Sequence, residues 1–121
     1  MKAMILAYES PGDFALRRAD KETFDAYMGG WIAYSEAMTK AGVARGGAAL
    51  KEPATATVVS IRDGFRRVED GPFADTKEQL GGYFIIEVAD LDEATRWAAR
   101  CPAAKTGFVD VRAIPDYGQG A

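Results

Sequence analysis

The chain has 121 residues, of which 48% are hydrophobic and 27% are charged, as in an ordinary single globular domain. Its net charge of −3 disfavours attraction to nucleic-acid phosphates or anionic lipid, and its apolar runs are too short to span a membrane. The sequence lacks histidine, the usual general base near neutral pH and a common ligand of haem and transition metals. We therefore expect one domain over residues 1–121, with no metal, no cofactor, no direct nucleic-acid contact and no membrane contact.

The N-terminus and the cysteine content indicate the compartment. Met1–Tyr8 carries one positive charge, but its apolar run is short and no small-residue cleavage pattern follows, so we expect no signal peptide. The single cysteine, Cys101, has no partner for an internal disulfide, which agrees with a reducing compartment. We expect a cytoplasmic protein in which Cys101, at the C-terminus of a helix, is a buried or inert thiol.

The first two predicted elements are a strand and a helix. Lys2–Tyr8 alternates in polarity and is followed by Ser10-Pro11-Gly12, which predicts a strand and then a turn. From Asp20 the apolar residues recur at steps of three and four until Gly42, which predicts a helix with a wide apolar stripe. The stripe includes three large residues that we expect in the core: Tyr27, Met28 and Trp31.

A hairpin follows, with strands predicted at 54–62 and 65–70. The connecting Asp63-Gly64 is the strongest two-residue hairpin signal, and it places Arg62 opposite Phe65. One face of this hairpin is richer in β-branched apolar residues, and we expect it to face inward: Thr57, Val59, Ile61, Arg66, Val68 and Asp70. Asp70 would then point inward where its strand ends.

The last third of the chain predicts a helical turn at 75–80, a strand at 82–89, a helix at 90–100 and a strand at 107–114. Asp90 and Glu93 form a capping box for the helix, and Pro102 stops it. The order of elements indicates an α+β fold, a ferredoxin-like βαββαβ antiparallel sheet with two helices on one face and an enlarged hairpin. The uncovered face would carry Tyr83, Ile85, Phe108 and Ile114, so we expect a homodimer that covers it.

The connection between the strands predicted at 65–70 and 82–89 is the most distinctive segment of the sequence. It reads Asp70-Gly-Pro-Phe-Ala-Asp-Thr-Lys-Glu-Gln-Leu-Gly-Gly-Tyr83 and resembles the signature of the DGPF branch of the YCII-related proteins. The likeness extends from the opening Met1–Tyr8 to the closing Gly107–Ile114. It implies a dimeric α+β barrel in a family whose members mostly lack an assigned reaction. Better-studied YCII-related proteins are associated with a His-Asp pair, which this chain cannot carry.

Charged residues on the predicted uncovered face are the first candidates for chemistry. They are Glu87, Asp110 and Arg112. In one interpretation Arg112 pairs with Glu87 or Asp110 and fixes the register of the interface. In another, burial raises the pKa of one carboxyl so that it serves as a general base, while Arg112 binds an anionic group of a ligand. A third interpretation leaves all three facing solvent.

The signature segment has two interpretations as well. Its residue types can all be explained by the turn itself, with Asp70 bonding the turn, glycine taking a positive φ and phenylalanine filling the core. Alternatively, the turn also forms the rim of a ligand pocket, with polar contacts from Asp70, Asp75, Lys77 and Glu78. Tyr8 and Tyr83 either pack or present their hydroxyl groups to the same cavity.

Two functions stay open at this point. The first is a small enzyme or binding protein for a small organic ligand, with its pocket between the sheets of a homodimer; Asp70 and Glu87 are then the candidate catalytic residues. The second is a non-catalytic interaction or regulatory module. Proteins that resemble this chain are often found beside or fused to extracytoplasmic-function sigma factors, which implies a sigma factor as a partner.

Overall fold

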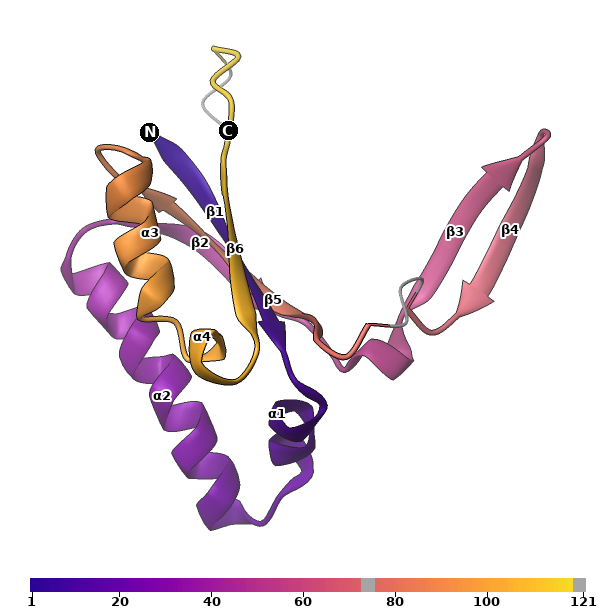
Figure 1. Ribbon diagram of the computed structural model, residues 1–121, viewed down its shortest axis with the longest axis horizontal. Coiled ribbons are helices and arrows are strands. Elements are labelled where there is room, and N and C mark those ends of the chain that lie inside the picture. The colour runs from indigo at the N-terminus through magenta and orange to yellow at the C-terminus, as the bar shows by residue number, and fades with distance from the viewer. Residues whose placement is uncertain (73–75, 119–121) are drawn as a thin grey trace.

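The computed structural model describes residues 1–72 and 76–118. Figure 1 shows one body of helices and strands from which a hairpin projects. In chain order the elements are β1 (Lys2–Glu9), α1 (Pro11–Ala15), the 3-10 turn η1 (Leu16–Arg18), α2 (Lys21–Lys40), β2 (Ala44–Ala49), the 3-10 turn η2 (Pro53–Thr55), β3 (Thr57–Arg62), β4 (Phe65–Asp70), β5 (Gln79–Glu87), α3 (Leu91–Ala99), α4 (Ala103–Thr106) and β6 (Phe108–Ala113). Within the described residues, no helix is long and apolar enough to cross a membrane.

The main sheet has the strand order β2-β5-β1-β6, and every neighbouring pair is antiparallel. The helix α2 connects β1 to β2, and α3 connects β5 to β6, so the body follows the βαββαβ plan. Both helices lie on the same side of the sheet (Figure 1). The predicted fold class, a ferredoxin-like α+β sheet with two helices on one face, is therefore confirmed.

The core lies between this face of the sheet and the two helices. Alternate residues of β1 are buried, because successive side chains of a strand point to opposite faces. Ile5 and Ile86 are fully buried, and each such side chain stabilises the fold by about 1.5–3 kcal/mol. The helices contribute Tyr34, Met38, Ala94 and Trp97. Cys101 is buried in the same cluster, as predicted, and burial raises the pKa of its thiol to about 11.

The second strand of the sheet was not predicted. It is β2, whose sequence Ala-Arg-Gly-Gly-Ala-Ala lacks the alternation and the β-branched residues that indicate strands. It pairs with β5, with Ala48 opposite Tyr83 and Ala49 opposite Gly82. The backbone amide of Leu50 continues this pairing by donating to the carbonyl of Gly81 over 2.9 Å. The chain leaves the sheet after Leu50 and returns to it at β5.

The predicted hairpin exists, with Arg62 opposite Phe65 and positive φ angles of 53° and 81° at Asp63 and Gly64. Its place in the fold differs from the prediction, because β3 and β4 form a separate two-stranded sheet that projects away from the body (Figure 1). The face expected to be inner is exposed, with Val59 and Ile61 each 59% accessible. Asp70 is exposed as well and does not point inward within the single chain. The prediction was wrong because β2 occupies the edge of the sheet that the hairpin was expected to fill.

The predicted helix caps are present. Asp20 accepts a hydrogen bond from the Thr23 amide over 2.8 Å and begins α2. Asp90 accepts from the Glu93 amide over 2.9 Å, while the Glu93 carboxylate accepts from the amide of Ala89. The expected turn at Ser10 is instead the cap of the short helix α1. The helical turn expected at 75–80 is wrong in its described part, where β5 already begins at Gln79.

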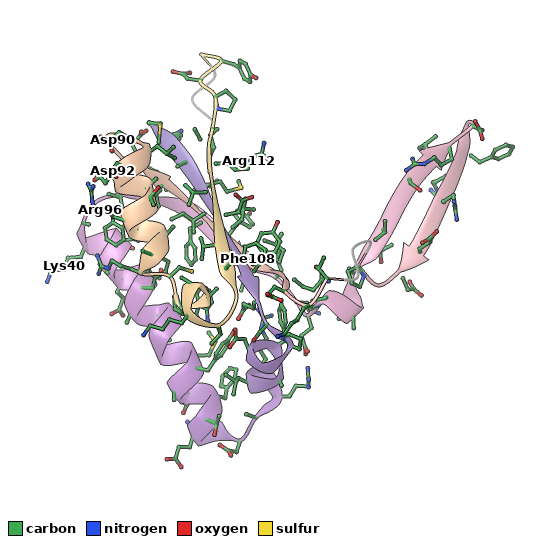
Figure 2. The ribbon with its side chains drawn as sticks, viewed as in Figure 1. Lys40, Asp90, Asp92, Arg96, Phe108 and Arg112 are labelled. Carbon is green, nitrogen blue, oxygen red and sulfur yellow. The ribbon has the colours of Figure 1, made fainter. Side chains whose placement is uncertain are left out.

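The sheet face opposite the helices carries the side chains that the sequence placed there. The register sets Leu6 between Tyr83 and Asp110, and Met4 between Ile85 and Arg112. Tyr8 stacks on Phe108 with ring centroids 4.6 Å apart, and Phe108 is 48% exposed. Figure 2 shows Phe108 and Arg112 on β6. This half-exposed apolar face is consistent with the homodimer, which stays a prediction.

Candidate functional site

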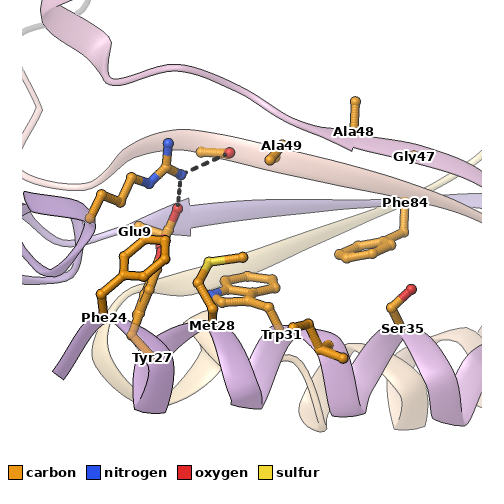
Figure 3. A pocket seen from close by; sticks show the side chains of 14 residues that line it. Glu9, Phe24, Tyr27, Met28, Trp31, Ser35, Gly47, Ala48, Ala49 and Phe84 are labelled. Atoms are coloured by element: carbon orange, nitrogen blue, oxygen red, sulfur yellow. Dashed lines mark hydrogen bonds and ion pairs between the residues drawn. The ribbon is translucent and has the colours of Figure 1, made fainter. Parts of the chain in front are cut away.

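A pocket of about 390 Å³ lies between α2 and the strands β2 and β5 (Figure 3). Space remains there because the strands present glycine and alanine to the helix, from Gly47 to Ala49 and at Gly81 and Gly82. Large apolar side chains form much of the remaining lining: Phe24, Met28, Trp31, Ile32 and Phe84. Both the volume and the apolar lining are typical of small-molecule sites.

A buried charge cluster lies at one end of this pocket. Glu9, the last residue of β1, is only 2% exposed, and its Oε2 lies 2.8 Å from Nη2 of Arg17 in η1. The hydroxyl group of Tyr27 in α2 donates to Oε1 of the same carboxylate. Arg17 also donates to the carbonyls of Gly81, over 3.2 Å, and Leu50. Three elements and the start of β5 therefore converge on one carboxylate.

The arrangement around Glu9 leaves no room for a side chain on Gly81. A Cβ atom there would lie 1.9 Å from Oε2 of Glu9 and 3.2 Å from Nη2 of Arg17. Glycine at this position thus lets the ion pair lie directly against the backbone of β5. Gly81 of the signature segment therefore has a structural role at this site that the sequence alone did not indicate.

The electrostatics of the cluster follow from its burial. A carboxylate removed from water is costly unless cations and hydrogen-bond donors compensate for the lost hydration, and Arg17 and Tyr27 supply both. Burial, together with the hydrogen bond to Glu9, raises the pKa of Tyr27 to about 12. Tyr27 is therefore a phenol at neutral pH and acts as a donor.

The cluster has capacity for a ligand. A carboxylate offers about four lone-pair directions, and Arg17 and Tyr27 use two of those on Glu9. Trp31 adds a second unused group, since its buried Nε1 has no hydrogen-bond partner among the described residues. The end of the pocket can thus accept a proton or a hydrogen bond at Glu9 and place an anionic group beside Arg17. No cluster of three or more metal-ligating side chains occurs within 1–72 and 76–118.

The sequence-predicted site residues lie elsewhere. Five of them share the uncovered face of the main sheet: Tyr8, Tyr83, Glu87, Asp110 and Arg112. Asp70 ends the projecting hairpin, and Lys77 and Glu78 precede β5. Asp75 lies outside the described residues. The eight described residues of this set do not line the pocket beside Glu9, and their proposed roles stay predictions.

Glu87 differs most from the expectation of a general base. It pairs with the N-terminal ammonium group of Met1 over 2.6 Å, rather than with Arg112. Hydrogen bonding to this ammonium, supported by the nearby charges of Lys2 and Arg45, lowers the pKa of Glu87. The direction is opposite to the raised pKa that burial would give to a base at this position.

The assignment of Tyr27, Met28 and Trp31 to the core was incomplete. All three are half-buried, and all three line the pocket. The sequence did contain a signal for Glu9, because it continues the alternation of the buried residues Ala3, Ile5 and Ala7. An acidic residue in a buried register requires partners. The identity of those partners depends on the turn between β1 and α2.

Comparisons with known proteins identify relatives of this chain. An uncharacterised protein of Rhizobium meliloti (strain 1021), R00369, is 47% identical over 55 residues, which are 44% of this chain and 44% of that protein. A solved structure of 5-chloro-2-hydroxyhydroquinone dehydrochlorinase (TftG) from Burkholderia phenoliruptrix AC1100, in complex with 2,5-dihydroxybenzoquinone, is similar with a TM-score of 0.53. The two chains are 19% identical, and the likeness covers 95% of this chain and 94% of the other. At this identity the likeness supports the fold alone.

A match to a family model shows which family the chain belongs to. The model of the YCII-related domain matches residues 1–117, which include the Asp70-Gly-Pro-Phe segment and all four strands of the main sheet. The resemblance stated from the sequence is thereby confirmed, and the chain belongs to the YCII-related family.

Proposed function

We propose that this protein binds a small organic ligand in the pocket between α2 and the strands β2 and β5, and moves a proton at the Glu9 end of that pocket. One observation carries the proposal. A carboxylate that is 2% exposed lies beside an arginine and a phenol at the end of a pocket with apolar walls. Buried acid and base groups in a concave apolar site are characteristic of functional centres.

The walls indicate the class of ligand. Phe24, Trp31 and Phe84 offer flat apolar surfaces, which suit a ring. At the polar end, Glu9 would accept from an acidic hydroxyl group, and Arg17 would stabilise the oxyanion that remains. The dehydrochlorinase of similar fold has a dihydroxybenzoquinone bound in its solved structure, which supports a hydroxylated aromatic ring or quinone as the ligand class.

The proposed step needs no cofactor. The O–H bond of the ligand breaks, its proton passes to Glu9, and the negative charge moves to the ligand oxygen beside Arg17. Tyr27, with its pKa of about 12, keeps its proton and holds the second oxygen of Glu9 in place. Glu9 would thus be the general base, a role that the sequence assigned to Asp70 or Glu87.

We also propose that two copies of the chain pair through the uncovered face of the main sheet. The half-exposed Met4, Leu6 and Ile85 support this, because a contiguous apolar face is stabilised by a partner. Tyr8, Tyr83, Asp110 and Arg112 would then line the space between the sheets. The regulatory alternative, with a sigma factor as partner, rests on the resemblance alone.

The test is ligand binding by the wild type, by Glu9→Gln and by Glu36→Gln. Glu36 is an exposed residue of α2 outside the pocket lining, so its variant carries the same chemical change away from the site. A panel of hydroxylated aromatic compounds is screened by thermal shift, and affinities of the hits are measured by titration calorimetry. Ultraviolet difference spectra report whether the bound phenol has lost its proton.

We expect Glu9→Gln to weaken binding about tenfold or more and to abolish the phenolate spectrum, since hydrogen bonds to charged groups contribute about 1.5–3 kcal/mol. Glu36→Gln should behave as the wild type. If Glu9→Gln and Glu36→Gln bound the ligand equally well, the proposed binding site beside Glu9 would be refuted. If Arg112→Gln weakened binding while Glu9→Gln did not, the ligand site would lie on the uncovered face of the sheet instead.

A further inference from the structure

The hairpin formed by β3 and β4, Thr57–Asp70, is here called the arm. It forms its own two-stranded sheet and does not pair with the main sheet. In Figure 1 it extends well away from the helices and from β6. Large apolar side chains on it are exposed, with Phe65 at the turn 75% accessible. An isolated two-stranded hairpin is marginally stable at best in water, so a covering surface would stabilise the arm.

One face of the arm is suited to such a contact. Val59 and Val68 lie directly opposite each other across the two strands, and Ile61 follows on the same face. Their accessible fractions are 59%, 51% and 59% in the single chain. Together they form a continuous apolar stripe along the arm, and burying it would strengthen the cross-strand pairing.

The charges of the arm indicate what covers this stripe. The arm contains three arginines and three acidic residues, so its formal charge is zero: Arg62, Arg66 and Arg67, with Asp63, Glu69 and Asp70. A balanced pattern gives no attraction to nucleic acid or to a strongly acidic or basic partner. Arg66 and Asp70, which have opposite signs, share the face of the stripe, and this is compatible with a second copy of the same face, as in isologous dimers.

The position of the arm leads to the same partner. It leaves the body between β2, an edge strand of the main sheet, and β5, the strand next to it. The other face of this sheet, opposite the helices, is itself half-exposed and apolar, with Tyr83 and Ile85 of β5 on it. The arm returns to the body at β5, the strand that carries part of this face, so a second copy docked on the face would be a candidate to cover both surfaces.

We propose that the arm is a dimerisation device, whose Val59, Ile61 and Val68 stripe packs against a second copy of this chain. The inference adds a specific contact to the proposed homodimer and is independent of the ligand pocket, which lies within one chain. Asp70 pairs with Thr57 at the base of the arm, where β4 returns to the body.

The experiment compares the wild type with the double variant Val59→Lys/Val68→Lys and with Ser60→Lys. Ser60 lies on the opposite face of the same strand, so its variant adds a lysine to the arm without touching the stripe. Sedimentation velocity over a dilution series gives the dimer dissociation constant, and hydrogen exchange followed by mass spectrometry reports protection of the arm amides. Fluorescence of Trp31 and Trp97, both in the body, checks that each variant is folded.

We expect a wild-type mass of twice 13.0 kDa and slow exchange in the arm that becomes fast on dilution to monomer. The double lysine variant should raise the dissociation constant about tenfold or more, because a lysine buried against apolar surface is costly. Ser60→Lys should resemble the wild type. Undiminished dimerisation of the double variant, fast arm exchange in the wild-type dimer, or a monomeric wild type would each overturn the proposal. Ligand binding in the pocket is measured separately and is expected to survive all three substitutions.

Discussion

Replacing Arg17 with methionine would remove the cation from a buried carboxylate while keeping most of the side-chain volume. Glu9 is 2% exposed, and the side chain of Arg17 is 20% exposed, so solvent can replace little of the lost interaction. Breaking a buried ion pair by removing one partner destabilises proteins by about 3–5 kcal/mol. Tyr27 continues to donate to Glu9, which places the expected loss near the lower limit, at about 3 kcal/mol.

This loss should appear as a lower melting temperature. With an unfolding entropy of about 2.1 cal/mol/K per residue, 3 kcal/mol corresponds to a fall in Tm of roughly 12 °C for a chain of this length. The Glu9→Gln/Arg17→Met double variant should recover much of this fall.

Denaturant titrations and thermal scans of the wild type, Glu9→Gln, Arg17→Met and the double variant complete a double-mutant cycle. A coupling free energy of about 1.5 kcal/mol or more between positions 9 and 17 would match the expectation. If Arg17→Met lost less than about 1 kcal/mol, or if the double variant were no more stable than Arg17→Met, the ion pair would not stabilise the fold as expected.

Two further predictions concern the same body. Gly81→Ala should destabilise the fold by about 1–3 kcal/mol and weaken ligand binding, because its Cβ would lie 1.9 Å from an oxygen of Glu9. Gly29→Ala is the matched control: its Cβ meets no atom within 4 Å, so it should be neutral or slightly stabilising, and equal stability of the two variants would contradict the packing around Glu9. Cys101, with its thiol pKa raised to about 11 by burial, should react with a disulfide reagent at pH 8 far more slowly in the native protein than in denaturant. Because the thiol ionises near pH 8.5 in the unfolded chain, its contribution to stability should be lost as the pH rises from there toward 11, and rapid native labelling at pH 8 would be inconsistent with the buried position.

Much of the fold was predictable because local signals determine it. Alternation in β1 and β5, the caps at Asp20 and Asp90, and the Asp63-Gly64 turn each depend on residues close together in the sequence. The strand β2 was not predictable in this way. Its small residues have little strand propensity of their own, and it is held as a strand by hydrogen bonds to β5, a partner more than 30 residues away.

The site was harder to predict for a related reason. The sequence directs attention to charged residues near its most distinctive segment, whereas the charge cluster in the pocket is assembled from β1, η1 and α2. Glu9 could have been noticed as an acid in a buried register. Its pairing with Arg17 depends on how α1 turns the chain, and the pocket depends on where the unpredicted β2 lies.

The junction at Leu50 and Gly81 has a consequence for how such a chain can vary. The hydrogen bond between these residues closes the sheet at the point where residues 51–78 depart, so the two ends of that long insertion are already neighbours. A segment whose ends are held together in this way can change in length or sequence without altering the lining of the pocket between α2 and the strands β2 and β5. The proposed dimer contacts of the arm and the proposed ligand specificity of the pocket could therefore evolve independently of each other.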